Sequence, residues 1–378
     1  MTKLLFTGDI ATDRALLEPS GGVLSASSKF NADIENLFNL HSFKIGNLEG
    51  SFSDAKNRTL KAGPNILLDY ATFRNFSGFF DVLSGANNHS MDYGEEGFRT
   101  TIRKLTECNI KYVGVGENNN EAFVPFESEK FVIFCVSENE FGASEKSKCG
   151  IATFDDLYIL YSQIKKFAGK KIVILYTHAG AEIIPIPPPY LRNFYKMLID
   201  FGCNIIINNH PHVVQGYETY NEGYIFYSLG NFMWDVNRFK GYQNSDWSLL
   251  VSCNITDDNK FSLSTFYSNI SGNEICLSKY KKYEEEMNFL CSLLASDDYE
   301  TLYNSIVSNI LHQVWYSKFF AKRSPSDTAE LLHYIRCSAH RNNIERALSI
   351  AIGEQTINTL KNHKLIYRNH DYFSIERI

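Results

Sequence analysis

Polar side chains of types that bind metal ions follow five apolar runs of the chain. Carboxylates, an asparagine amide and imidazoles stand directly after runs that have the composition of buried strands. The five segments are Gly8-Asp9, Asn47-Leu48-Glu49, Asn87-Asn88-His89, residues 178–182 (from His178 to Glu182) and His210-Pro211-His212. Mixed oxygen and nitrogen donors suit Mn, Fe and Zn ions. Ligands of open α/β sheets bind beyond the carboxyl ends of the strands, so the segments predict one shared metal site.

Each segment taken alone has an ordinary structural interpretation. An aspartate after a glycine, such as Asp9, commonly forms a turn or caps a helix, and Asn87-Asn88 is also typical of turns. A single histidine such as His178 is more often a hydrogen-bonded polar group than a ligand. His210-Pro211-His212 is harder to explain by packing, because a rigid proline separates two imidazoles directly after a buried strand. The joint occurrence of the segments at strand ends favours the metal site.

The elements that must position these side chains alternate between strands and helices. Continuous β-branched runs such as 172–175 and 205–207 suit strands that are buried on both faces. We expect strands at 3–7, 43–48, 81–85, 112–115, 131–137, 172–177, 203–207, 224–229 and 249–255, and helices at 93–108, 155–167 and 189–201. This alternation predicts a layered α/β domain.

The pattern changes near residue 280, where amphipathic helical segments replace the alternation. We expect these helices at 281–294, 299–320, 327–340 and 343–361. The sequence therefore predicts an α/β domain over residues 1–280, including a β-rich transition at 249–280, and a helical C-terminal module over residues 281–378.

Composition limits the classes of protein. The 378 residues carry a net charge of −6, which argues against a general nucleic-acid-binding surface. None of the eight cysteines pairs in a CxxC motif, which favours reduced thiols. The sequence shows no signal-peptide pattern and no apolar run of about 20 residues, so we expect a cytoplasmic protein without a membrane anchor.

Seven ordered motifs between residues 3 and 235 resemble the CapA family of bacterial capsule and poly-γ-glutamate biosynthesis proteins. Besides the five segments above, they include Asp92-Tyr93-Gly94 and the run from Tyr227 to Phe232. Two positions differ from the family pattern: Ala179 stands where tryptophan is common, and Asn208-Asn209 stands where Gly-His is common. The resemblance implies the calcineurin-like metallophosphoesterase fold, a layered αββα domain.

The resemblance also implies a binuclear centre of divalent metal ions, Mn, Fe or Zn. In that centre Glu49 would bridge two metals. Asp9 and His212 would complete one metal site, and Asn88, His178 and His210 would complete the other. Two ions of this kind bind a phosphate and activate a water molecule. One superfamily ligand is absent, because position 11 is Ala11.

Four further residues are expected near that centre. The resemblance implies that His89 donates a proton to the leaving oxygen or steadies the phosphate. Glu182 and Asp92 are expected to orient neighbouring histidines, although Asp92 equally suits a helix N-cap. Asn231 is expected either at the catalytic site or in a turn.

These features predict a metal-dependent hydrolase, acting on a phosphoester and linked to capsule or surface-polysaccharide biosynthesis. One alternative is an amide-bond or polymer-handling enzyme of the poly-γ-glutamate type. Another is a non-catalytic scaffold in a polysaccharide assembly complex. The expected partner is a small-molecule or glycan-linked phosphoester, with no nucleic acid, and a homodimer is compatible with the C-terminal helices.

Overall fold

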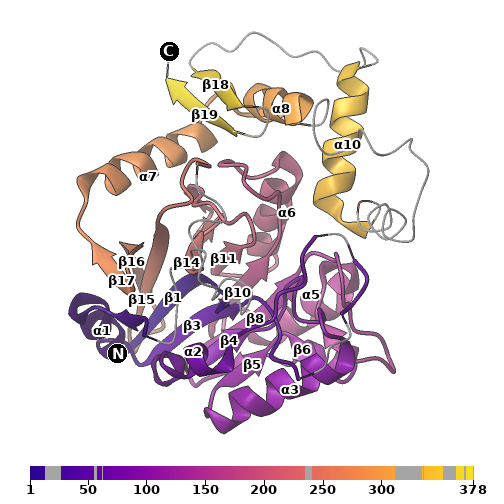
Figure 1. Cartoon of the computed structure of the whole chain (residues 1–378), viewed down its shortest axis with the longest axis vertical. Coiled ribbons are helices and arrows are strands. Elements are labelled where there is room, and N and C mark those ends of the chain that lie inside the picture. The colour runs from indigo at the N-terminus through magenta and orange to yellow at the C-terminus, as the bar shows by residue number, and fades with distance from the viewer. Residues whose placement is uncertain are drawn as a thin grey trace.

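A computed structural model of the chain shows two large β-sheets and a set of surrounding helices (Figure 1). It describes residues 1–12, 27–54, 58–61, 63–234, 241–310, 334, 336–351, 363–369 and 372–377. No helix among these residues has the length and apolar character needed to span a membrane.

The first sheet joins a parallel half to an antiparallel half. The parallel half is β1 (Thr2–Ile10), β3 (Phe43–Leu48), β4 (Val82–Ser84) and β5 (Lys111–Val113). The antiparallel half is β15 (Ser248–Ile255), β16 (Phe261–Ser271) and β17 (Glu274–Ser278), which continues from β1. Short strands β2 (Lys29–Phe30) and β14 (Asn231–Met233) pair with β17 and β1. The predicted β-rich transition at 249–280 is therefore part of this sheet.

The second sheet has a parallel centre with antiparallel edges. Its centre is β8 (Phe131–Ser137), β10 (Ile172–His178), β11 (Ile205–Asn209) and β13 (Gly223–Phe226). Its edges are β7 (Phe126–Glu127) and β12 (Tyr217–Tyr220). A separate small pair is formed by β6 (Val115–Gly116) and β9 (Gly150–Ile151).

Alternate side chains of β1 divide between two cores, because successive residues of a strand point to opposite faces. Leu4 and Phe6 contact the core that includes the second sheet, whereas Leu5 belongs to the core under the helices of the first sheet. The hydroxyl of Tyr176 on β10 donates a hydrogen bond to the carbonyl of Thr7, which joins the two sheets directly. The sheets therefore pack against each other.

Helices cover both outer faces of this pair of sheets. The first sheet carries α1 (Ala32–Asn39), α2 (Tyr70–Arg74) and α3 (Gly94–Glu107), and the second carries α5 (Leu157–Phe167) and α6 (Pro189–Asp200). Short helices lie at α4 (Asn119–Ala122), η2 (Ser77–Phe79) and η3 (Phe154–Asp156). This arrangement confirms the predicted layered α/β architecture with helices outside and sheets inside.

The C-terminal part contains helices and a hairpin. Helix α7 (Lys281–Leu294) has its predicted bounds, α8 (Tyr299–Ile310) starts as predicted, and α10 (Ser338–Ala351) begins before the predicted residue 343. Most of the predicted helix at 327–340 and residues 311–320 and 352–361 lie outside the described residues. The hairpin of β18 (His363–Asn369) and β19 (Tyr372–Arg377) was not predicted. The division into two domains at residue 280 stays a prediction.

Candidate metal centre

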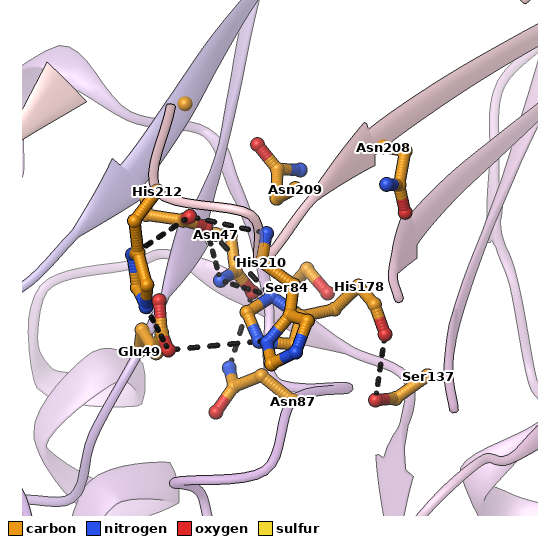
Figure 2. Close-up of polar contacts among 12 residues, drawn as sticks. Asn47, Glu49, Ser84, Asn87, Ser137, His178, Asn208, Asn209, His210 and His212 are labelled. Atoms are coloured by element: carbon orange, nitrogen blue, oxygen red, sulfur yellow. Dashed lines mark hydrogen bonds and ion pairs between the residues drawn. The ribbon is translucent and has the colours of Figure 1, made fainter. Parts of the chain in front are cut away.

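The six predicted metal ligands come together where strands of the two sheets end. Figure 2 shows Glu49, His178, His210 and His212 of this set. Asp9 lies on β1, Glu49 follows β3 and Asn88 follows β4 in the first sheet. In the second sheet His178 ends β10, while His210 and His212 follow β11. All six residues are at most 6% exposed. Parallel strands end at the same edge of a sheet, and the packing of the two sheets against each other brings the two edges together.

Glu49 is shared by two groups of potential ligands. One group is Glu49, His178 and His210, and the other is Asp9, Glu49 and His212; within each, the ligand atoms lie within 4.8 Å of one another. Oε1 of Glu49 lies 3.5 Å from Nε2 of His178 and 3.7 Å from Nε2 of His212. A carboxylate in this place can contact two cations at once, which is the role that the resemblance implies for Glu49.

Asn88 adds an oxygen to the first group. Its Oδ1 lies 3.1 Å from Nε2 of His178, and its Nδ2 donates a hydrogen bond of 2.9 Å to Glu140. The amide oxygen of Asn88 therefore faces His178, while its amide nitrogen faces Glu140.

The segment that carries His210 and His212 has a strained backbone. His210 has a φ of 98° and His212 has a φ of 57°, and non-glycine residues adopt such values at a cost. The backbone N–H of His210 donates to Oδ2 of Asp9 over 3.2 Å. This bond fixes the turn after β11 against the end of β1 and brings both imidazoles to the shared edge.

Two asparagines that were not predicted as site residues hold Asp9 in place. Nδ2 of Asn47 donates to Oδ1 of Asp9 over 2.8 Å and lies 3.2 Å from Nδ1 of His178. Oδ1 of Asn47 accepts from Nδ2 of Asn87 over 3.1 Å (Figure 2). The signal was in the sequence, because both residues lie inside the segments that carry Glu49 and Asn88.

The electrostatics of the cluster favour a cation. Burial raises the pKa of Asp9 to about 7. Burial also holds the pKa of His178 well below its ordinary value, so its imidazole is neutral at neutral pH. Burial lowers the pKa of His210. The negative charges of nearby carboxylates, of which Glu140 has the largest effect, outweigh burial and raise this pKa to about 9. The buried carboxylates of Asp9 and Glu49 and the neutral imidazole of His178 form a donor set that fits divalent metal ions, and an ion bound there would displace the proton that His210 holds at neutral pH.

His89 contacts both a buried lysine and a buried aspartate. Nδ1 of His89 lies 2.7 Å from Oδ2 of Asp92 and 3.0 Å from Nζ of Lys61, and Lys61 also pairs with Asp92. Burial, with the charge of Lys61, lowers the pKa of His89 to about 4. This contact is compatible with the expected orienting role of Asp92, which stays a prediction, and the N-cap of α3 is Tyr93 and not Asp92. Sequence reasoning missed Lys61, because nothing in its surroundings marks it as buried.

Asn231 and Glu182 differ in how closely they approach the cluster. Oδ1 of Asn231 lies 2.9 Å from Nδ1 of His212, and its Nδ2 donates to the carbonyl of His212 over 3.2 Å. Glu182 is half-buried on the segment after β10, and its charge raises the pKa of His210. The structure thus places Asn231 against a predicted ligand and Glu182 within electrostatic range of another.

Sequence reasoning also missed Glu138 and Glu140, which follow β8. Both are buried, and Oε1 of Glu140 lies 3.2 Å from Nε2 of His210. Glu138 accepts hydrogen bonds from the backbone of Gly180 and from the hydroxyl of Tyr190. These glutamates stand after a predicted strand, as the other site residues do, so the same rule could have found them.

Comparisons with known proteins give a consistent result for this chain. A family model described as the bacterial capsule synthesis protein PGA_cap matches residues 3–236. The capsule biosynthesis protein CapA of Bacillus anthracis is 34% identical over 196 residues, which are 47% of this chain and 45% of that protein. The PGA biosynthesis protein CapA of Bacillus subtilis (strain 168) is 30% identical over 249 residues, which are 61% of this chain and 62% of that protein.

The chain therefore spans about half to three fifths of the length of these relatives. A solved structure of a protein from Thermus thermophilus aligns with a TM-score of 0.36 and 11% identity, over 71% of this chain and 99% of that one. The family model covers more than half of the chain and contains all six predicted metal ligands. The chain thus belongs to the family of bacterial capsule synthesis proteins described as PGA_cap.

Proposed function

We propose that this chain is a metal-dependent hydrolase that cleaves a phosphoester in capsule or surface-polysaccharide biosynthesis. The observation that carries the proposal is the pair of ligand groups that share Glu49. Two divalent ions held there would bind phosphate oxygens and supply an activated water. The names of the two relatives support the link to capsule biosynthesis.

Each buried residue of the cluster has a distinct task in this proposal. Glu49 contacts both groups, Asp9 and His212 complete one, and Asn88, His178 and His210 complete the other. Asn47 and Asn231 hold Asp9 and His212 by the hydrogen bonds described above. Because these contacts exist before substrate binds, the site is preorganised and little reorganisation is needed during the reaction.

We assign His89 a contact with the phosphate group of the substrate. Its Nε2 lies 3.8 Å from Oε1 of Glu49, so the imidazole borders the cluster. With a pKa of about 4, the imidazole is neutral at neutral pH. A neutral imidazole with its hydrogen on Nε2 can donate a hydrogen bond to a phosphate oxygen, so we assign His89 to steadying the phosphate and not to donating a proton as an imidazolium.

The proposal is tested by metal analysis together with hydrolysis of two model esters. Purified protein is analysed for bound metals and assayed with bis-p-nitrophenyl phosphate and p-nitrophenyl phosphate, with added Mn²⁺ and after chelation. We expect about two metals per chain and turnover that disappears with the metal. Bound metal without phosphoester turnover would favour the polymer-handling alternative. Failure to bind metal after reconstitution would favour the scaffold alternative.

A further inference from the structure

Glu140 contacts two of the predicted ligands of the first group with its two carboxylate oxygens. Its Oε2 accepts a hydrogen bond of 2.9 Å from Nδ2 of Asn88, and its Oε1 lies 3.2 Å from Nε2 of His210. Glu140 is 4% exposed. Among the described residues Glu140 belongs to neither group of converging ligand atoms, and the contacts given above are with two of the predicted ligands.

The contact with Asn88 decides which end of the amide faces the centre. An asparagine amide has a donor end and an acceptor end on opposite sides. Because the donor end of Asn88 points to Glu140, the acceptor Oδ1 points to within 3.1 Å of Nε2 of His178. A metal ion requires the oxygen and not the NH₂ group, so this orientation is the one that can bind it.

The contact with His210 decides which imidazole nitrogen is available. Nδ1 of His210 lies 3.0 Å from Nε2 of His178, and Nε2 of His210 faces Glu140. An N–H on Nε2 that donates to a carboxylate leaves a lone pair on Nδ1, directed into the group. Carboxylates that accept from the second nitrogen of a ligand histidine fix its tautomer and raise its basicity.

Contacts from the C-terminal part of the chain hold the segment that carries Glu140. Glu138 accepts a hydrogen bond of 2.7 Å from the backbone N–H of Ala339 in α10, and Sγ of Cys337 lies 3.8 Å from Oε1 of Glu140. The N–H of Glu140 donates to the carbonyl of Glu138 over 3.1 Å. Residues 337–339 lie beyond the segment that the family model matches, so this support is additional to the family motifs.

We propose that Glu140 is a positioning residue that orients Asn88 and His210 toward the metal ion bound by the first group. This inference rests on the metal centre of the proposed function. It assigns to the segment after β8, and to the C-terminal residues that contact it, a part in holding one of the two ions. The position formed by Asp9, Glu49 and His212 does not depend on Glu140.

The experiment measures Mn²⁺ binding to metal-free wild type and Glu140→Gln by the electron paramagnetic resonance signal of free Mn²⁺. Glutamine keeps the shape of the side chain, but it cannot accept hydrogen bonds from both Asn88 and His210 as a carboxylate does. We expect the affinity of one of two Mn²⁺ positions to fall about 10- to 100-fold and the other to stay unchanged. The visible absorption of the Co²⁺-loaded variant should change as well, because it reports ligand geometry.

Glu145→Gln is the matched control, since Glu145 is an exposed glutamate five positions further along the chain. Its Mn²⁺ isotherm should match wild type. Thermal unfolding of the metal-free proteins shows whether Glu140→Gln folds. If Glu140→Gln does not fold, Glu140→Asp is the second variant, because aspartate keeps the charge but moves the carboxylate away from Asn88 and His210. The affinity of the first group for Mn²⁺ should still fall in this variant.

Three outcomes separate this inference from the proposed function. Two wild-type Mn²⁺ positions that both persist at full affinity in the folded Glu140 variant would overturn the role of Glu140 alone. A wild type that binds Mn²⁺ but hydrolyses no phosphoester would overturn the proposed reaction, while the binding data still decide the role of Glu140. A wild type that binds no metal would overturn both.

Discussion

Nζ of Lys61 lies 3.0 Å from Nδ1 of His89, in a pocket where Lys61 also forms an ion pair with Asp92. Nδ1 of His89 lies 2.7 Å from Asp92 as well. These two neighbours select opposite tautomers of the imidazole, because Lys61 can only donate to Nδ1 and the carboxylate can only accept from it. The tautomer in which Lys61 donates to Nδ1 carries the hydrogen on Nε2, the nitrogen that borders Glu49, and it is the tautomer that the proposed role of His89 requires.

Replacement of Lys61 by methionine should destabilise the protein. The side chains of Lys61 and Asp92 are each 1% exposed, so the variant leaves a buried carboxylate without its lysine partner. Removal of one partner of such a pair costs about 3–5 kcal/mol. Urea unfolding of the metal-free protein measures the free energy of unfolding. Lys146→Met, at an exposed position, should stay at the wild-type value. A Lys61→Met variant as stable as this control would contradict the structural role of the pair.

Alanine at Asp9, Asn88 or His210 should remove metal and activity without unfolding the chain. Each change deletes one donor atom of a buried group, so the affinity for an ion falls while the surrounding sheets keep their cores. Metal analysis, ester hydrolysis and circular dichroism are the measurements. Asn120→Ala, at an exposed asparagine, is the control and should behave as wild type. Full metal content and activity in the Asn88 and His210 variants would refute the site.

His89→Ala should keep both metals and lose turnover. Loss of one hydrogen-bond donor to a charged transition state costs about 10²- to 10³-fold in kcat. His89→Gln separates the two assignments, because a glutamine amide can donate a hydrogen bond but cannot act as a general acid. Partial recovery of kcat in His89→Gln supports the role in steadying the phosphate. Equal losses in both variants would support proton donation instead.

Metal removal should lower the thermal stability of the wild type. A ligand that binds only the folded state stabilises it by about 2.7 kcal/mol at a hundredfold excess over Kd. Differential scanning calorimetry before and after chelation, and after return of Mn²⁺, measures the change in Tm. Asp9→Ala should show a smaller shift, since it lacks one donor of the second group. An identical Tm with and without metal would argue against binding at this cluster.

Glu218 should make the free energy of unfolding depend on pH in the acid range. Burial raises its pKa, but hydrogen bonds from Arg192 and Tyr227, at 2.7 and 2.6 Å, outweigh burial and hold the pKa below the ordinary 4.5. A carboxylate with a lowered pKa stabilises the fold above its unfolded pKa, and this stability is lost as the pH falls through its folded pKa.

The wild type should therefore lose more free energy of unfolding than Glu218→Gln between about pH 6 and about pH 3. Urea unfolding at several pH values gives this difference. Glu129→Gln, at an exposed glutamate, is the control and should follow the wild type. Parallel pH profiles of wild type and Glu218→Gln would show that the pair with Arg192 contributes nothing to this dependence.

The sequence determined that the segments which contain the six residues from Asp9 to His212 follow apolar runs with the composition of buried strands, and the family resemblance supplied the set of six ligands. Parallel strands of one sheet end at one edge, so the polar residues after those strands lie together within each sheet, and the packing of the two sheets joins the two sets. The layered architecture followed from the same alternation of strands and helices. The hairpin at 363–377 was not found, because its short alternating run lies beyond a long stretch of helical pattern.

Only the tertiary structure decided the residues that orient the predicted ligands. Lys61 comes from an irregular segment before β4, and Cys337 and Ala339 come from a segment about 200 residues beyond Glu138. No periodicity links such positions, since their contacts depend on how loops fold over the edge of the sheets. The pKa values of His89 and His210 were likewise fixed by burial and by neighbouring charges that only the folded chain brings within reach.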